Sequence, residues 1–370
     1  MKNNKIKKSK LSNFKNKLDF WATNSEEGGW NISSTDEGSQ KMLEDENEKQ
    51  IKIQTGTEVV DDFVIDEDTS DDERMIVNMG PQHPSTHGVL RLQAELEGEV
   101  VRRVKPIIGY LHTGMEKTGE ELNYFQGPTN TTRMDYLSPL FNELVFSLTT
   151  EKLIGIEVPK RAETIRILMT ELNRVSSHLV ALATGGMDIG ALSMMIFGFR
   201  ERELILNFFE KTTGLRMNHN YIRPGGVAAD LPDGWQKDVE EILKIIPEKL
   251  QDYDDMLLDN PIWKGRLQNV GILTTEECFA YGVTGPSLRA SGYSWDLRKS
   301  QPYSGIENYE FDVPTLTEGD VFARWRVKVL EIFESLKIIE QAMNNMPKGP
   351  YKVQDKKITP PPRKRLDESM

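Results

Sequence analysis

The sequence predicts an α+β fold in which helix predominates, with a small N-terminal antiparallel sheet followed by a helical bundle. Between residues 75 and 104, apolar and polar residues alternate in short runs, which is the period of half-buried strands. From about Gly114 onward, apolar residues recur at spacings of three and four, which is the period of amphipathic helices. A length of 370 residues with 38% hydrophobic and 28% charged residues suits a globular protein with a sizeable core.

The first 72 residues differ in composition from the rest of the chain. Residues 1–20 contain seven lysines and one acidic residue, whereas residues 58–73 contain nine acidic residues and no basic residue. Such blocks of like charge repel themselves and bury little, so we expect residues 1–72 to be a disordered or loosely attached extension. The expected folded domain is residues 73–370, divided into a sheet with a histidine loop at 73–113, a helical core at 114–346 and a Pro- and Lys-rich tail at 347–370.

Three strands are expected at the start of the domain. Residues 75–79 are mainly apolar, residues 89–96 alternate, and residues 100–104 follow a turn at 97–99. The first two strands enclose a loop that contains His83 and His87, two of the five histidines in the chain, among prolines and glycines. A histidine held on a rigid scaffold can exchange a proton near neutral pH. The alternative is a turn whose histidines only cap backbone groups, and the local sequence leaves both possibilities open.

Four long helices are expected from the spacing of apolar residues. The first begins after Pro159 and is expected to stop at Gly185-Gly186. The others are expected at about 192–211, ending at Gly214, and at 237–257 and 321–343. On a second face of the first helix, Glu171, Arg174 and His178 recur at helical spacing and are expected to form a satisfied polar network.

Composition and the single cysteine exclude several classes of function. A net charge of -12 argues against a nucleic acid partner, because phosphate binding requires clustered Lys and Arg. Cys278 alone provides neither a disulfide framework nor the thiolates of a nickel-iron or iron-sulfur centre, and we expect it to be a small buried residue. Gly225-Gly226 lacks the GxGxxG spacing of a dinucleotide loop. No run of about 18 apolar residues is present, so no segment is expected to span a bilayer.

Five sequence blocks carry a family resemblance. The histidine loop GPQHPSTHGVLRL is followed in order by IGYLHTGMEK, TRMDYLSP, ELNRVSSHLVALATGGMDIGA and RPGGVAADLPDGW. Together they resemble the quinone-site subunit, known as the D-type subunit, of respiratory complex I, the proton-pumping NADH:quinone oxidoreductase. The resemblance extends from about Met75 to about Trp325 and implies the fold of the large subunit of nickel-iron hydrogenases, to which that family is related.

The resemblance implies a role for four residues. His87 and Tyr136 are expected to hold the quinone headgroup, with His83 close to it. Reduction of a quinone to a quinol adds two electrons and two protons, and an imidazole and a phenol can each hydrogen-bond one carbonyl oxygen and supply one proton. Asp188 is implied to be a buried carboxylate that pairs with His87.

Alternatives remain for Asp188 and for nearby apolar residues. Asp188 follows a pair of glycines, so from the local sequence it can also be the N-cap of a helix that starts near Ile189. Met79, Met134 and Phe197 lie near the implied site residues in the sequence and are expected to belong to the core rather than to contact quinone.

The resemblance also implies an assembly. This chain is expected to bind no cofactor itself; an iron-sulfur sister subunit brings electrons, and NADH and FMN bind elsewhere in the complex. A C-type subunit of the same complex and a membrane subunit at the quinone entrance are further expected partners. The implied location is peripheral, on the cytoplasmic side of a bacterial cell membrane. A ferredoxin-type donor in place of NADH, or a catalytically silent assembly scaffold, are the alternatives.

The chain departs from the family pattern at three places. Thr113 stands where many members have arginine, and His219 lies one residue later than the histidine that usually precedes the RPGG block. A shift of one residue turns a side chain by about 100° on a helix, or moves it to the opposite face of a strand. The resemblance therefore does not imply proton-coupled tuning of the partner's cluster through this histidine. Family members also continue well beyond the equivalent of Met370, so we expect the C-terminus to be truncated.

Overall fold

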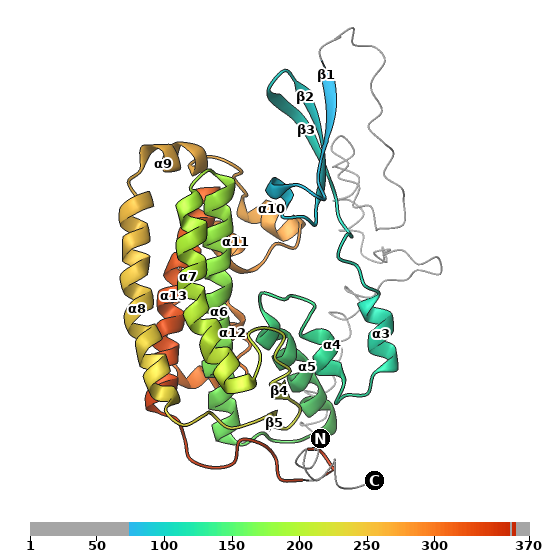
Figure 1. Cartoon of the computed structure of the whole chain (residues 1–370), viewed down its shortest axis with the longest axis vertical. Coiled ribbons are helices and arrows are strands. Elements are labelled where there is room, and N and C mark those ends of the chain that lie inside the picture. Colours follow the sequence, from blue (N-terminus) through green and yellow to red (C-terminus); the bar gives the residue numbers. More distant parts are fainter. Residues whose placement is uncertain (1–73, 356, 360–370) are drawn as a thin grey trace, which may run out of the picture. The chain divides into compact units, whose positions relative to one another are not determined.

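The computed structural model describes residues 74–355 and 357–359 (Figure 1). The described residues fall into two compact units. One unit contains residues 74–76 and 95–102, and the other contains residues 77–94 and 103 onward. The expected extension at 1–72 and residues 360–370 of the expected tail lie outside the described residues.

The N-terminal strands form the expected three-stranded sheet, in the order β1–β2–β3. Its strands are β1 (Arg74–Met79), β2 (Arg91–Glu97) and β3 (Val100–Ile107). In the smaller unit, Arg74 forms an ion pair of 3.2 Å with Glu95. In the larger unit, the Arg91 guanidinium donates two hydrogen bonds of 3.1 and 2.9 Å to Asn78 Oδ1. Each of these contacts connects β1 to β2, the two strands that flank the histidine loop.

The remainder of the larger unit is mainly helical, which confirms the predicted fold class. Its helices are α3 (Met115–Glu121), α4 (Gly127–Thr131), α5 (Pro139–Ile154), α6 (Lys160–Asp188), α7 (Leu192–Thr213), α8 (Trp235–Leu257), α9 (Pro261–Leu267), α10 (Thr275–Ala280), α11 (Gly285–Ala290), α12 (Leu297–Ser300) and α13 (Val321–Asn344). Two short strands, β4 (Ile222–Arg223) and β5 (Gly226–Val227), pair between α7 and α8. None of the helices within the described residues is both long and apolar enough to cross a bilayer.

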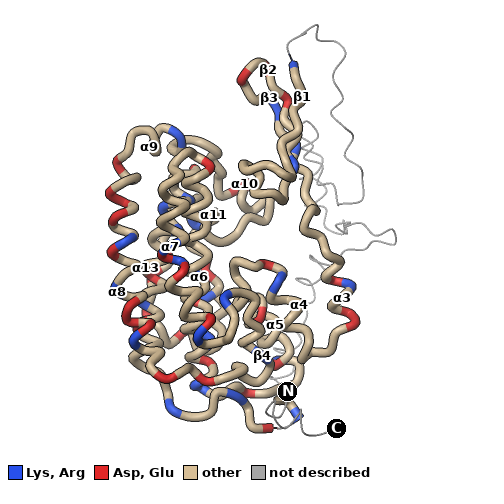
Figure 2. Tube along the Cα trace, in the orientation of Figure 1, with Lys and Arg blue, Asp and Glu red and all other residues tan. Residues whose placement is uncertain are grey.

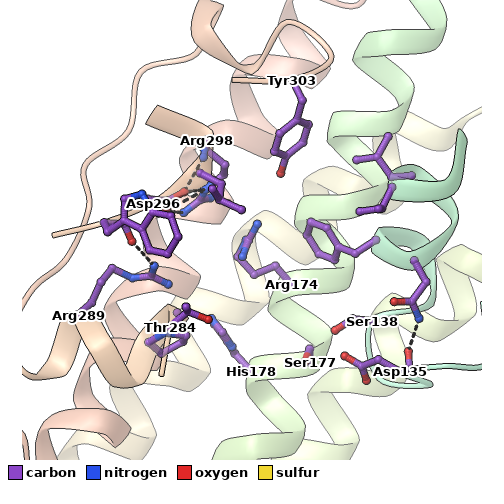
Figure 3. Close-up of a pocket in the computed structure, with 18 of the residues that line it drawn as sticks. Asp135, Ser138, Arg174, Ser177, His178, Thr284, Arg289, Asp296, Arg298 and Tyr303 are labelled. Atoms are coloured by element: carbon purple, nitrogen blue, oxygen red, sulfur yellow. Dashed lines mark hydrogen bonds and ion pairs between the residues drawn. The ribbon is translucent and has the colours of Figure 1, made fainter. Parts of the chain in front are cut away.

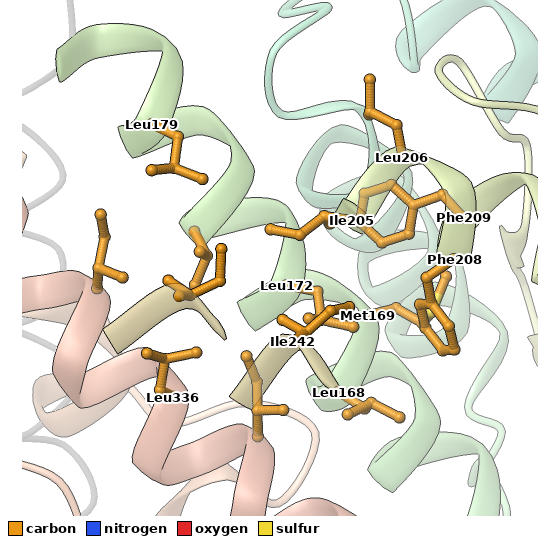
Figure 4. Packing of buried hydrophobic residues seen from close by; sticks show 14 of the residues in the cluster. Leu168, Met169, Leu172, Leu179, Ile205, Leu206, Phe208, Phe209, Ile242 and Leu336 are labelled. Carbon is orange, nitrogen blue, oxygen red and sulfur yellow. The ribbon is translucent and has the colours of Figure 1, made fainter. Parts of the chain in front are cut away.

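The core is built around α6, which packs most extensively against α7 and α13. Leu168, Leu172 and Leu179 of α6 are fully buried and belong to one cluster with side chains from α7, α8 and α13 (Figure 4). Each fully buried side chain of this size stabilises the fold by roughly 1.5–3 kcal/mol. α8 completes the bundle and has one apolar face. Figure 2 shows charged residues of both signs along the length of this helix.

The expected boundaries are confirmed at three of the four long helices and wrong at the end of α6. Gly214, in the left-handed conformation, ends α7, as its position after the last apolar residue predicts. α6, however, continues through Gly185-Gly186 to Asp188. A Cβ on Gly186 would lie 2.7 Å from Cβ of Met194, so the glycine permits a close approach of α7. Packing between two helices therefore outweighs the cost of about 1 kcal/mol for a glycine within a helix.

Replacement of Gly198 tests this close packing. A Cβ at position 198 would lie 2.8 Å from Cβ of Ala183 and 3.2 Å from the Leu179 carbonyl oxygen, on the facing surface of α6. We expect Gly198→Ala to lower the free energy of unfolding by about 1–3 kcal/mol in urea denaturation of the purified chain. Gly185→Ala is the control, because nothing lies within 4 Å of its added Cβ, and alanine should stabilise the helix by up to about 1 kcal/mol. Equal losses in both variants would contradict the packing argument.

Candidate functional site

The histidine loop is organised by a buried threonine. Its centre is a single turn of 3₁₀ helix, Pro84–Thr86, with His83 before it and His87 after it. Thr86 is 2% exposed, and its hydroxyl donates to the carbonyl oxygens of Pro81 (3.2 Å) and His83 (3.0 Å). His83 Nδ1 accepts hydrogen bonds from the Ser85 backbone N–H (3.2 Å) and the Ser85 hydroxyl (2.6 Å). His83 therefore caps the turn, as one of the two sequence interpretations requires.

Two residues of the loop adopt left-handed backbone conformations. Gly80 has φ +81°, and a Cβ there would lie 2.1 Å from the Leu90 carbonyl oxygen and 2.5 Å from the Thr86 hydroxyl. Only glycine fits this position. His87 has φ 53°, which is uncommon for a residue with a side chain. The turn thereby separates the two histidines: His83 bonds within the loop, and His87 is directed out of it.

His87 meets Asp188, a residue 101 positions later in the chain. His87 Nε2 lies 3.1 Å from Asp188 Oδ2, and both residues belong to the larger compact unit. The two side chains are 42% and 40% exposed. The expectation of a buried carboxylate is therefore wrong for this chain, because Asp188 is the last residue of α6 and lies at an accessible helix end. An ion pair this exposed contributes at most about 1 kcal/mol, so it orients the imidazole more than it stabilises the fold.

The alternative role of Asp188 as an N-cap is also wrong. Asp188 is the last residue of α6, and the next helix begins at Leu192, after Ala191. Asp188 therefore stands at the carboxyl end of a helix, where the unpaired carbonyl groups favour a neighbouring cation. The imidazole of His87 lies beside this helix end.

Tyr136 lies on a separate segment between α4 and α5. It is 45% exposed, and its hydroxyl makes no hydrogen bond with any residue in the described part of the chain. It therefore makes no direct polar contact with His87 or Asp188. Of the four site residues expected from the sequence, the structure brings two into contact and leaves the phenol of Tyr136 free to accept another partner.

Apolar residues near these positions differ in their environment. Phe197 is half-buried and packs against the core, as expected. Met134 is 65% exposed, so its assignment to the core is wrong for this chain, because the turn at residues 132–138 holds it away from the helices. Met79 is half-buried at the end of β1.

Two buried polar residues that bond to the segment of Tyr136 are not predicted from the sequence. Glu143 on α5 is 0% exposed and Asn173 on α6 is 2% exposed, and both bond to the segment that carries Tyr136. The available signal was the position of Glu143 within the mainly apolar run PLFNELVF, where a carboxylate requires donors. Asn173 gives no comparable signal, because asparagine in a helix is usually exposed.

The expected polar network on α6 is confirmed. Glu171 accepts hydrogen bonds from Arg174 (3.1 and 3.3 Å), Arg298 (3.1 Å) and the Ser335 hydroxyl (2.8 Å). Burial alone would raise the pKa of Glu171, but the two guanidinium groups hold it below its ordinary value. His178 bonds to Glu331 at 2.7 Å, and burial lowers the pKa of His178.

This network borders a cavity of about 560 Å³ between α5, α6 and residues 284–303. Figure 3 shows Arg174 and Tyr303 directed toward one another across it. None of His83, His87, Tyr136 and Asp188 lines this cavity. The arginines at its wall are all paired, Arg298 with Asp296, Arg174 with Glu171 and Arg289 with Glu331. We therefore regard the cavity as bordered by a structural network and place the candidate site at the histidine loop.

His219 is buried in a turn rather than on a helix or strand. It is 5% exposed, its Nε2–H donates to the Arg216 carbonyl oxygen (3.0 Å), and its ring lies edge-on to Phe209 at 4.9 Å. Nδ1 has no hydrogen-bond partner among the described residues. Burial lowers the pKa of His219 to about 4, so the ring is neutral at pH 7. The one-residue shift of this histidine therefore neither rotates it around a helix nor moves it to the other face of a strand.

Comparison with known proteins gives a consistent family assignment. Residues 188–370 match the family described as respiratory-chain NADH dehydrogenase, 49 Kd subunit. The D 1 subunit of NADH-quinone oxidoreductase from Salinispora arenicola is 58% identical over 296 residues, which cover 80% of this chain and 67% of that protein. The D subunit from Rhodococcus jostii is 58% identical over 292 residues, covering 78% and 67%, and that from Mycobacteroides abscessus is 54% identical over 314 residues, covering 84% and 73%.

His219 is expected to make stability depend on pH. Its folded pKa of about 4 lies below the value of about 6.5 for an unfolded histidine. As the pH falls from 7 to 4, the unfolded chain takes up a proton that the folded chain does not, so folding loses on the order of 3 kcal/mol. His219→Gln should lack this component when urea denaturation is compared at the two pH values. If wild type and variant lose the same free energy, the neutral buried histidine is contradicted.

Proposed function

This chain belongs to the family of the 49 kDa subunit of the respiratory-chain NADH dehydrogenase, and from that membership we propose that it forms the quinone-reduction site of a proton-translocating NADH:quinone oxidoreductase. The observation that carries the proposal is the contact of 3.1 Å between His87 and Asp188. A loop held by a buried threonine presents an imidazole to a carboxylate at a helix end, on an accessible face. That is an arrangement that can hold and release one proton.

The proposed chemistry requires two protons and two electrons for each quinone. His87 and Tyr136 each donate a hydrogen bond to one carbonyl oxygen of the headgroup, which orients the ring and withdraws electron density from it. When both carbonyl oxygens have been reduced to hydroxyls, one proton has come from the imidazolium and one from the phenol. Asp188 then faces a neutral imidazole and loses its compensating charge. His83, bonded to Ser85, maintains the shape of the loop next to the headgroup.

The electrons are supplied from outside this chain. We assign them to an iron-sulfur cluster of a sister subunit, with NADH and FMN bound elsewhere in the complex. Exposed large apolar side chains that lie close in the sequence to Asp188 and Tyr136 support a covering partner and an apolar substrate. Leu192 is 61% exposed, Ile196 is 64% exposed and Met134 is 65% exposed.

The proposed location is peripheral, on the cytoplasmic side of a bacterial cell membrane. A C-type subunit of the complex and a membrane subunit at the quinone entrance complete the set of proposed neighbours. A complex of the same construction that takes electrons from ferredoxin uses the same residues of this chain, because the donor is bound by other subunits.

Tyr136→Phe tests the proposed role of the phenol. We expect NADH:quinone activity in isolated membranes to fall at least tenfold, because a positioned acid contributes roughly 10²–10⁴-fold to a proton transfer. The assay uses a short-chain quinone at several concentrations. Tyr281→Phe is the matched control, since Tyr281 is exposed and has no proposed role.

Two measurements separate a catalytic loss from a structural one. Native gels report assembly of the complex, and NADH oxidation with ferricyanide reports the electron path before the quinone. An assembled complex with an unchanged quinone rate would remove Tyr136 from the mechanism.

His87→Ala distinguishes the proposed site from an assembly scaffold. A scaffold predicts unchanged quinone reduction in this variant and loss of the complex only when the chain is deleted. The proposed site predicts an assembled complex that oxidises NADH with ferricyanide and reduces quinone at a small fraction of the wild-type rate. Because the His87–Asp188 contact is exposed, we expect the variant to assemble normally.

A further inference from the structure

Tyr136 lies on a segment whose two ends are each held by a buried polar side chain. The segment consists of residues 132–140, between α4 and the first turn of α5. Glu143 holds its beginning and Asn173 holds its end. The intervening residues 133–136 are exposed, so their position depends on these two anchors.

Glu143 accepts four hydrogen bonds from two different parts of the chain. Its Oε1 accepts from the Thr132 hydroxyl (2.7 Å) and from the backbone N–H of Asn220 (2.6 Å). Its Oε2 accepts from the backbone N–H groups of Tyr221 (2.8 Å) and Ile222 (2.9 Å). Four donors match the capacity of a carboxylate, and a fully buried carboxylate is tolerated only with such partners. Within the described part of the chain, no ion pair includes Glu143, so hydrogen bonds alone define its position.

Asn173 holds the other end of the segment. Its Nδ2 donates to the Leu137 carbonyl oxygen (2.8 Å), and its Oδ1 accepts from the Leu140 backbone N–H (3.1 Å). Asp135 closes the turn locally: its Oδ1 accepts from the Leu137 N–H at 3.1 Å, and its carbonyl oxygen accepts from Asn142 Nδ2 at 3.0 Å. The backbone on both sides of Tyr136 is thus fixed, while the phenol hydroxyl has no partner among the described residues.

We propose that Glu143 is a positioning residue for Tyr136, acting through Thr132, with Asn173 as the second anchor of the same segment. The proposal rests on the proposed role of Tyr136 in quinone reduction. Neither anchor is exposed to the substrate, so neither exchanges a proton with it. Their contribution is the placement of the phenol, and a displacement of about 1 Å at a reacting group can reduce a rate roughly 100-fold.

The arrangement requires a carboxylate, which makes Glu143→Gln an informative change. An amide has one oxygen, and its nitrogen can only donate. If that nitrogen faces Thr132, the Asn220 N–H loses its acceptor; if it faces the other side, the N–H groups of Tyr221 and Ile222 both lose theirs. Glutamine has nearly the same size, so the change alters hydrogen bonding without opening a cavity.

Thr132→Val is a milder test that breaks only the link toward Tyr136. Thr132 is 0% exposed, and valine has a similar shape but no hydroxyl, so the three backbone donors of Glu143 remain bonded. Thr170→Val is its matched control: Thr170 is also buried, but its hydroxyl donates only to carbonyl oxygens of its own helix. Glu151→Gln is the matched control for Glu143→Gln, because Glu151 is a buried carboxylate of the same helix that binds Arg166 and the Gly225 N–H.

The experiment measures kcat and KM for a short-chain quinone in membranes that contain the assembled complex. Ferricyanide activity and native gels are recorded for each variant. We expect Glu143→Gln to lower kcat/KM for quinone about tenfold or more, and Thr132→Val to lower it less, with ferricyanide activity unchanged. The quinone kinetics of Thr170→Val and of assembled Glu151→Gln should match wild type.

A double variant separates positioning from a general structural effect. If Glu143 acts through Tyr136, then Tyr136→Phe with Glu143→Gln should be no slower than the slower single variant, because the phenol is already absent. Multiplied losses in the double variant would overturn the proposal. So would wild-type quinone kinetics in assembled Glu143→Gln while Tyr136→Phe is slow.

Failure of the proposed function has a different signature. An unchanged rate in Tyr136→Phe alone would remove the role of the phenol and, with it, the premise of this inference. If Glu143→Gln does not assemble, Thr132→Val decides: quinone kinetics equal to those of Thr170→Val would overturn the positioning role.

Discussion

Burial of α6 along most of its length is the constraint on which the rest of the structure depends. A helix surrounded by other elements must find partners for every polar side chain that it carries, because a buried polar group without a partner costs about 1–3 kcal/mol. Thr170 of α6 donates to carbonyl oxygens of its own helix, and four other buried polar residues of α6 bond to different neighbours. The pairs are Arg166 with Glu151 of α5, Glu171 with Arg298, Asn173 with Leu137 and Leu140, and His178 with Glu331 of α13. The polar residues of one helix thereby hold α5, α12, α13 and the segment of residues 132–140 against it.

The residues of the candidate site are exposed but lie next to these buried elements. Asp188 is the last residue of α6, is partly exposed, and meets a histidine on a loop with its own buried threonine. Tyr136 is exposed on a segment that Asn173 of α6 holds from behind. Three side chains from three segments are therefore placed by rigid backbones while their reactive atoms remain accessible. In the proposed complex, the sister subunit and the quinone would supply the surfaces that exclude water.

Glu143 connects the segment of Tyr136 with the segment of His219. One carboxylate accepts from Thr132 before the tyrosine and from three consecutive N–H groups that follow the histidine. Asn218 and Asn220, on either side of His219, have φ of 53° and 48°, which asparagine tolerates better than most residues. The unusual position of this histidine is therefore built into a specific turn, and the neutral ring contributes packing against Phe209.

Local periodicity determined much of this protein. Alternation and helical spacing located the three strands, the four long helices and the network of Glu171, Arg174 and His178, because each pattern reports which side of one element is buried. The burial of Cys278 followed from its being the single cysteine of the chain. The sequence blocks determined the family. Only the tertiary structure decided that α6 passes through two glycines, that Asp188 is an exposed helix end, and that Glu143 and Asn173 hold the tyrosine segment. These depend on atoms brought together from distant parts of the chain, and no periodicity within one element records the position of a partner on another.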